Sequence, residues 1–245
     1  MDDLLYYFPD ITFRSTITPE YTHRITEDYI FAREKGFKNY FFMPNCRQSW
    51  TLEAIQELGY QMSCIGWLMY QDIINDRHTL VYTDLVRTMA NMVIKDDYCK
   101  GKDIDYRQCG FGCNSVGITT NGTISACQER NTYNETDLFV IGDIYKGIDE
   151  FKHSRLLQNI EEQPKRKSES LKCENCPIKE KCSTRVCPST NYDMTGHPCT
   201  SPDITCYWQI LLYEVAKAIC ETAALENNEK FANFLKNNAK ALSKC

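Results

Sequence analysis

The sequence lacks any uninterrupted apolar stretch of the roughly 20 residues that a membrane-spanning helix needs. Its longest apolar segment, 207–225, is broken by polar residues that include Gln209, Glu214 and Lys217. The N-terminal residues MDDLLYYFPD carry acids where a secretory signal carries basic residues, and no apolar core follows them. These absences argue against a membrane-embedded or exported protein, so we expect a cytoplasmic location and no membrane partner.

The sequence also lacks a large excess of charge of either sign. It has 28 basic and 33 acidic residues, which gives a formal net charge of −5 at pH 7. Proteins that bind nucleic acids through the phosphate backbone usually present a strongly basic surface. The one basic cluster, at 164–172, is more typical of a solvated loop than of a nucleic-acid patch. We therefore expect no nucleic-acid partner.

Histidine is scarce, with 4 residues scattered along the chain, whereas cysteine is abundant, with 14. A reducing cytosol rarely preserves structural disulfides, so this number of cysteines needs another explanation. Metal binding is the usual one, and the scattered histidines make thiolates the expected ligands.

The first part of the chain alternates between strand and helix patterns. Strands are predicted at 10–18 and 37–45, and helices at 26–36 and 49–76, the second with Ser49 as its N-cap. Strands that are separated by helices pair in parallel through right-handed crossovers. Two parallel strands cannot cover both of their own faces. The region 1–78 therefore reads as a piece of a larger α/β sheet or barrel.

The rest of the chain divides into three segments. A helical connector is expected over 79–106, and two helices, about 207–224 and 227–243, over 207–245. Between them, 107–206 is rich in cysteine and loop-forming residues. Short strands are predicted at its beginning, joined by Asn121 and Gly122, an Asn-Gly pair that favours a two-residue type I′ hairpin turn.

Eight cysteines form an ordered pattern in that middle segment. In chain order they are Cys109, Cys113, Cys127, Cys173, Cys176, Cys182, Cys187 and Cys206. Close spacings such as Cys109-x3-Cys113 and Cys173-x2-Cys176 turn the chain around a bound metal, and eight thiolates suffice for two four-coordinate sites. Glycines beside them allow close backbone approach.

Three kinds of site compete for these cysteines. Zinc accepts four thiolates, but a zinc ribbon normally needs two Cys-x2-Cys turns and this segment has one. A disulfide-rich secreted module is disfavoured because no export signal is found. Iron–sulfur ligation is the third kind of site, and the spacing alone does not decide between it and zinc. A non-catalytic zinc module that binds peptides is therefore the alternative function.

Three runs of residues carry a resemblance to a known family. CGFGCNSVGITTNGTISAC, CENCPIKEKCSTRVC and CYWQILLYEVAKAI resemble the SPASM domain of radical SAM peptide and protein maturases. Cys109-x12-Gly122-x4-Cys127 matches the family pattern. The chain departs from it once, with four residues rather than three between Cys182 and Cys187. The resemblance covers 107–206 and implies an iron–sulfur module.

The resemblance also implies which cysteines hold which cluster. Two 4Fe–4S clusters are expected in an interlaced arrangement. By position, the first would be held by Cys109, Cys113, Cys127 and Cys187. The second would be held by Cys173, Cys176, Cys182 and Cys206, with Cys199 as the alternative to Cys206. Cys206 is preferred because the final cysteine of the family stands just before a helix, and some relatives lack the ligand at Cys113.

The segment 10–45 is similar to the second half of a radical SAM barrel. In relatives, an arginine at a strand end helps to hold S-adenosylmethionine, which makes Arg14 and Thr16 candidates for that role. An ordinary ion pair at a strand end is the competing explanation for Arg14. The expected fold is therefore α/β: the C-terminal part of a (β/α) radical-SAM-type barrel, then a SPASM module with a short hairpin, then C-terminal helices.

One motif of the family is missing from the sequence. The Cys-x3-Cys-x2-Cys motif that binds the radical-generating cluster is absent, because Cys113 is followed by Val116 where the third cysteine would stand. We therefore expect the chain to be inactive alone, and S-adenosylmethionine to be a cofactor only of the complete enzyme. The partners implied are an N-terminal radical SAM half and a peptide or protein substrate.

The function implied by the resemblance is that of auxiliary clusters in ribosomal peptide or protein maturation. Such clusters accept an electron or bind the substrate while the complete enzyme forms a thioether or oxidises a side chain.

Overall fold

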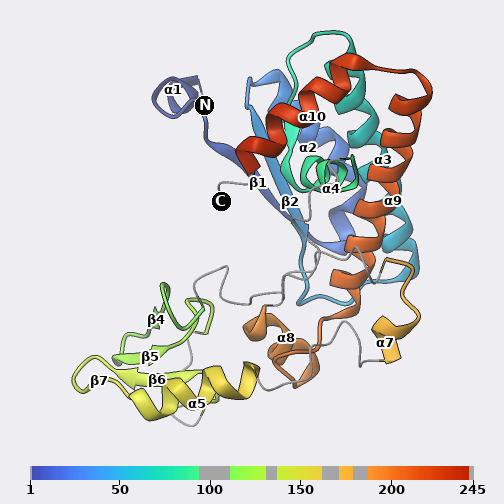
Figure 1. Ribbon diagram of the computed structural model, residues 1–245. Helices are drawn as coiled ribbons and strands as arrows, with labels where there is room; N and C mark the ends of the chain where they lie inside the picture. The colour runs from blue at the N-terminus through green and yellow to red at the C-terminus, as the bar shows by residue number, and fades with distance from the viewer. Residues whose placement is uncertain (1, 94–110, 131–136, 162–170, 179–186, 243–245) are drawn as a thin grey trace. The chain divides into compact units, whose positions relative to one another are not determined.

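The protein was analysed as a computed structural model that describes residues 2–93, 111–130, 137–161, 171–178 and 187–242 (Figure 1). The chain divides into two compact units. Unit one contains residues 1–100 and 204–245, and unit two contains residues 101–203. Each unit has its own buried apolar core.

Unit one is built on a three-stranded parallel sheet in the order β1-β2-β3. Its elements are α1 (Asp2–Tyr7), β1 (Thr12–Ile17), η1 (Pro19–Arg24), α2 (Ile25–Glu34), β2 (Asn39–Pro44), α3 (Leu52–Ile74), β3 (Val81–Tyr82) and α4 (Thr83–Val93). The alternation of strand and helix confirms the α/β prediction. The short strand β3 lies where only a helical connector was expected, because a two-residue strand leaves no periodic pattern to detect.

Aromatic side chains form the centre of unit one. Tyr40, Phe42 and Tyr82 are fully buried on one face of the sheet, and the Phe42 and Tyr82 rings stack with centroids 4.6 Å apart. Tyr29 of α2 meets Tyr40 edge-on, at 5.4 Å between centroids. Helices α2, α3 and α4 lie on the same side of the strands in Figure 1. Alternate residues of β1 point to the other face and are exposed.

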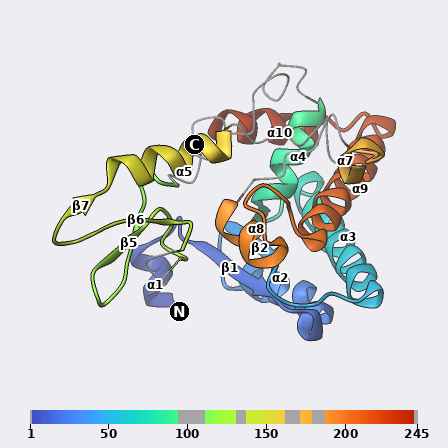
Figure 2. The ribbon, with the colours of Figure 1, turned by 90° about the horizontal axis from the view of Figure 1, so that it is seen from below.

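The helices α9 (Asp203–Leu225) and α10 (Glu229–Leu242) belong to unit one. α3 and α9 run side by side in Figures 1 and 2. A Cβ atom placed on Gly66 would lie 2.8 Å from the side chain of Ile219 and 2.9 Å from that of Val215. The absence of a side chain at Gly66 therefore lets α9 approach α3 closely. The sequence analysis treated 207–245 as a segment of its own, whereas the contacts join it to the sheet.

The predicted helix boundaries shift by a few residues. α3 begins at Leu52 rather than near Ser49, and its N-cap is Thr51, whose hydroxyl accepts a hydrogen bond from the Ala54 amide at 3.2 Å. The prediction of Ser49 as the N-cap is therefore wrong. Both residues are good caps, and the choice between them depends on where the chain leaves β2.

Unit two contains a four-stranded antiparallel sheet in the order β4-β5-β6-β7. Its elements are β4 (Gly117–Ile118), β5 (Thr123–Ser125), β6 (Val140–Asp143), β7 (Gly147–Ile148), α5 (Glu150–Glu161), α7 (Leu171–Glu174) and α8 (Pro188–Thr195). α5 packs beside β6. The core is small and includes Phe111, Phe139 and Leu156.

The hairpin between β4 and β5 differs from the expected type I′ turn. The Thr119 amide donates to the Thr123 carbonyl at 3.0 Å, which encloses three loop residues instead of two. Only the second residue of the Asn-Gly pair, Gly122, has a positive φ, of 89°. A type I′ turn needs positive φ at both central residues. The prediction of the hairpin is right, and the prediction of its turn type is wrong.

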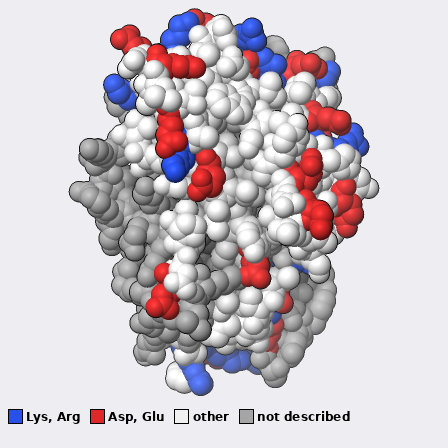
Figure 3. Space-filling view, turned by 90° about the vertical axis from the view of Figure 1, so that its right-hand side faces the viewer, with Lys and Arg blue, Asp and Glu red and all other residues white. Residues whose placement is uncertain are grey.

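No helix in the described ranges is long and apolar enough to cross a membrane. In the space-filling view of Figure 3, acidic and basic side chains are interspersed on the face shown. The basic segment 164–172 falls largely outside the described residues.

Candidate metal centre

Two predicted ligands of the first group, Cys113 and Cys127, lie on neighbouring segments of unit two. The Gly112 amide donates to the Ala126 carbonyl at 2.8 Å, so the residues that precede Cys113 and Cys127 are joined directly. Gly112 has a φ of 65°, a conformation that suits glycine and turns the chain at this point. The Cys113 side chain is exposed and that of Cys127 is half-buried. Cys109, the remaining predicted ligand of this strand pair, lies outside the described residues.

Cys187 reaches the same place from a distant part of the sequence. It is the N-cap residue of α8, with φ −106° and ψ 100°, and Pro188 begins the helix. Burial raises the pKa of the Cys127 thiol and the nearby Cys187 raises it further, while the Glu129 backbone amide and the Ser189 hydroxyl lower it. These influences identify Cys187 and Ser189 as neighbours of Cys127. The fold thus brings together two cysteines that the sequence keeps far apart.

The surroundings of Cys127 and Cys187 suit a group that carries sulfur acceptors. The hydroxyl of Ser125 is buried and lacks a hydrogen-bond partner among the described atoms, and the Ser189 hydroxyl lies beside the Cys127 thiol. Buried hydroxyls without partners are costly, and an iron–sulfur cluster would offer them thiolate and sulfide acceptors. Cys187 also stands at the N-terminus of α8, where its backbone leaves the helix. The residues present therefore fit the expected cluster.

The second group of ligands is described only in part. The Cys176 amide donates to the Cys173 carbonyl at 3.1 Å, which closes the Cys-x2-Cys segment into a turn, and both side chains are half-buried. Cys182 lies outside the described residues. Within the described ranges, no three Cys, His, Asp or Glu side chains converge on one point. The described residues therefore assemble a complete ligand set at neither predicted site.

The two candidates for the last ligand lie in different units. Cys199 belongs to unit two, where it packs against the small core, and its amide donates to His197 Nδ1 at 3.2 Å. Cys206 belongs to unit one. It was expected just before a helix, but α9 begins at Asp203, so Cys206 lies within the first turn. The helix starts earlier because Asp203 and Ile204 extend its pattern beyond the cysteine.

Arg14 and Thr16 lie two residues apart on β1 and are both exposed. The Arg14 guanidinium lies 5.4 Å from the centroid of the Phe41 ring, its register partner on β2. Among the described residues, no acidic side chain forms an ion pair with Arg14. The strand-end ion pair that was the alternative role for this arginine is therefore not found in the described part of the chain. The S-adenosylmethionine role of both residues stays a prediction.

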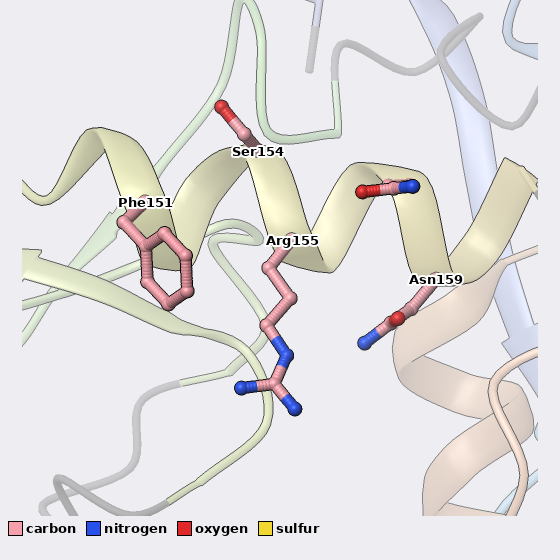
Figure 4. A pocket seen from close by; sticks show the side chains of 5 residues that line it. Phe151, Ser154, Arg155 and Asn159 are labelled. Atoms are coloured by element: carbon pink, nitrogen blue, oxygen red, sulfur yellow. The ribbon is translucent and has the colours of Figure 1, made fainter.

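A surface depression on α5 contains no predicted site residue. Phe151, Ser154, Arg155, Gln158 and Asn159 line it, and all come from this one helix. Arg155 and Asn159 project from the same side of α5 in Figure 4. The depression is a feature of the exposed helix surface and is separate from the cysteines.

Comparison with known proteins shows what the cysteine-rich segment is similar to. Residues 109–177 match the family model of SPASM, an iron–sulfur cluster-binding domain. The matched range includes Cys109, Cys113, Cys127, Cys173 and Cys176 of the predicted ligands. The match covers less than half of the chain and identifies this segment as similar to an iron–sulfur cluster-binding domain. A search of curated proteins found no match.

The chain is also similar to a solved structure, that of hexahistidine-tagged anSMEcpe with bound AdoMet. The TM-score is 0.55 at 13% sequence identity, and the match covers 96% of this chain and 60% of that one. The chain therefore spans somewhat more than half the length of this neighbour. The likeness confirms the predicted fold class, an α/β barrel segment together with a SPASM module.

Sequence reasoning did not identify two polar residues beside the first ligand group. Ser189 follows Cys187 by two positions, and Arg130 follows Cys127 by three. Neither belongs to the cysteine pattern. Their positions near the predicted ligands become apparent only in the folded structure, where the segments that carry Cys127 and Cys187 lie close together. Proximity to a predicted ligand was the one signal available in the sequence.

Proposed function

We propose that this chain is the auxiliary two-cluster portion of a radical SAM maturase that modifies a ribosomally made peptide or protein. The observation that carries the proposal is the match of residues 109–177 to the SPASM iron–sulfur domain, and the position of Cys187 near Cys127 supports it. A zinc module would use the same ligand chemistry. The buried hydroxyl of Ser125, which has no partner among the described atoms, favours a group with additional sulfur acceptors.

The proposal assigns one 4Fe–4S cluster to each group of ligands. Cluster I takes Cys109, Cys113, Cys127 and Cys187, and cluster II takes Cys173, Cys176, Cys182 and Cys206, with Cys199 as the alternative. The turn between Cys173 and Cys176 supports the second assignment, because it presents two ligands from one short segment.

The chemistry proposed is one-electron transfer or substrate binding. Clusters of this kind supply an acceptor for the electron that a substrate radical gives up, or an iron that a substrate thiolate binds. The chain's own residues decide which iron a substrate can reach. Cys113 is exposed and Cys127 is half-buried, so we place the substrate on the Cys113 side of cluster I. The bound peptide would there be oxidised or joined through a thioether.

The radical-generating part is proposed to pair with strand β1. Among the described strands, β1 has a partner on one side alone, β2. The segment before it exposes apolar side chains, with Tyr6 80% exposed and Phe8 60% exposed. An unpaired strand beside exposed aromatic residues is a typical place for another strand to add. A radical SAM half that contributes such a strand would extend the sheet toward a barrel.

S-adenosylmethionine would bind only when that half is present. Arg14 and Thr16 lie on the exposed face of β1, where an added part of the barrel would cover them. The chain by itself has no Cys-x3-Cys-x2-Cys motif. It is therefore expected to produce no 5′-deoxyadenosine from S-adenosylmethionine and dithionite.

Metal analysis after anaerobic reconstitution with iron and sulfide tests the proposal. We expect about eight irons and eight sulfides per chain, and a broad absorption band near roughly 400 nm that dithionite bleaches. The zinc alternative is tested in parallel by purifying the chain from cells supplied with zinc and iron. A colourless protein that holds zinc and takes up no iron on reconstitution would overturn the proposal.

A further inference from the structure

Arg130 is the most buried charged residue of unit two for which the structure gives side-chain partners. Its side chain is only 11% exposed. It follows Cys127 by three residues, and its backbone amide donates to the Cys127 carbonyl at 3.0 Å. This hydrogen bond closes a turn that begins at Cys127 and ends at Arg130. A shift of the Arg130 backbone would therefore shift the Cys127 backbone as well.

The guanidinium of Arg130 joins two segments of unit two. One nitrogen, Nη2, donates to Asp137 Oδ2 at 2.5 Å, and the other, Nη1, donates to Asp193 Oδ1. Asp137 precedes β6, and its other oxygen accepts from the Phe139 amide at 2.9 Å. Asp193 lies on α8, the helix that Cys187 caps. Arg130 thus links the turn that carries Cys127 to the helix that carries Cys187.

Aromatic rings hold the guanidinium in this position. Its central carbon lies 4.8 Å from the centroid of the Phe139 ring and 5.4 Å from that of Tyr192. The two rings themselves meet edge-on at 5.4 Å. A planar cation with two carboxylates and two rings has a single well-defined orientation. Tyr192, like Asp193, belongs to α8, so both kinds of contact fix the same helix.

We propose that Arg130 is a positioning residue for cluster I. By fixing α8 against the turn after Cys127, it sets the separation between the Cys127 and Cys187 thiols that the cluster requires. The inference rests on the proposed function, because it needs a cluster at these cysteines. Residues that orient metal ligands typically change metal affinity by about 10-fold to 100-fold when they are replaced. Arg130 would act through the ligands and would not touch the cluster.

The test uses the full chain with one cluster site removed at a time. Cys176→Ala leaves cluster I as the main iron site, and Cys127→Ala leaves cluster II. In the first background, Arg130→Gln should release iron to a ferrous chelator about ten-fold faster or more under anaerobic conditions. In the second background the same substitution should leave the release rate unchanged. The electron paramagnetic resonance signal of reduced cluster I should change, and that of cluster II should not.

Companion variants separate positioning from general stability. Arg130→Lys keeps one ion pair and should restore part of the iron retention. Asp193→Ala removes the ion pair to α8, leaves the Asp137 and Tyr192 contacts of Arg130 and should reproduce part of the effect, and adding Arg130→Gln to it should cause less loss than the sum of the two single changes. Arg33→Gln is the matched control, because it breaks the Arg33–Asp72 ion pair of unit one, 2.6 Å long with Asp72 buried. It should lower the melting temperature without speeding iron release from cluster I.

Each remaining outcome decides the matter. If the unaltered chain takes up no iron, the proposed function fails, and the inference about Arg130 fails with it. If the unaltered chain holds both clusters and Arg130→Gln changes neither, the inference alone is overturned. Equal loss of both clusters would also overturn it, because a general folding defect produces that pattern. Should Arg130→Gln fail to fold, Asp193→Ala provides the same comparison with Arg130 still in place.

Discussion

The two units of the molecule are stabilised in different ways. Among the described residues, the core of unit one contains 27 buried apolar residues from strands and helices at both ends of the chain. The core of unit two contains seven. A small core rarely stabilises a domain by itself, and bound metal commonly supplies the remaining free energy. We therefore predict that unit one folds on apolar burial, whereas unit two depends on the metal that its cysteines are proposed to bind.

The largest expected effect comes from removing the metal. Stripping iron from the reconstituted chain under anaerobic conditions should leave unit one folded and loosen unit two, because only unit two has too small a core to remain ordered. Hydrogen exchange measured by mass spectrometry should speed up in the β4–β7 sheet and stay slow in α3 and α9. Equal acceleration in both units would contradict the comparison.

A substitution in unit one should have a smaller effect, confined to that unit. Gly66→Leu places a side chain where the side chains of Ile219 and Val215 already lie within 3 Å of a Cβ position. Overpacking of this kind costs about 1–3 kcal/mol of unfolding free energy, which urea denaturation followed by far-ultraviolet circular dichroism would measure. Gln71→Leu, at an exposed position of the same helix, is the control and should change stability by less than about 0.5 kcal/mol.

The iron content of Gly66→Leu sharpens the comparison further. All four predicted ligands of cluster I lie in unit two, so Gly66→Leu should retain the iron of cluster I. Loss of cluster I iron from Gly66→Leu would mean that the two units do not fold independently.

The smallest expected effect concerns a cysteine that binds no metal. Burial raises the pKa of the Cys220 thiol to about 11, and the neighbouring Glu221 adds to the rise. A thiol with an ordinary pKa of about 8.5 is partly ionised at pH 8, so Cys220 should react with iodoacetamide roughly 100-fold more slowly. Peptide mapping after timed alkylation of the folded chain measures this rate. A rate equal to that of the urea-unfolded chain would contradict the prediction.

The same pKa shift has a consequence for stability at high pH. The folded-state pKa of Cys220 is raised above the unfolded value, so its contribution is fully present below about pH 8.5. The contribution is lost as the pH rises toward 11. Unit one should therefore lose part of its stability in this alkaline range, and Cys220→Ala should reduce the loss. Thermal melts between pH 8 and 10.5 would check the direction.

Much of unit one was predictable because its signals are local. The pattern from Thr12 to Ile17 and the aromatic run ending at Pro44 fixed two strands, and the apolar spacing of α3 fixed a helix. The strand β3 was missed because two residues carry no period. The N-cap of α3 was misplaced because Ser49 and Thr51 are chemically equivalent candidates, and only the path of the chain from β2 decides between them.

The candidate site was predictable as a set of residues but not as an arrangement. The resemblance predicted that Cys127 and Cys187 bind one cluster, and this assignment stays a prediction, although the structure makes the two cysteines neighbours. The choice between Cys199 and Cys206 stays a prediction, since the two lie in different units. The role inferred for Arg130 had no sequence signal, because its carboxylate partner on α8 lies in a distant segment.

The sequence by itself showed the cysteine pattern, most of the order of strands and helices in unit one, and the absence of the Cys-x3-Cys-x2-Cys motif, because residue types and short spacings carry that information. Only the tertiary structure decided that α9 and α10 complete the core of the N-terminal sheet, and that a buried arginine ties Cys127 to the helix of Cys187. Those outcomes depend on which distant surfaces fit together. Shape complementarity, such as the space left by Gly66 for α9, exists only after the chain has folded.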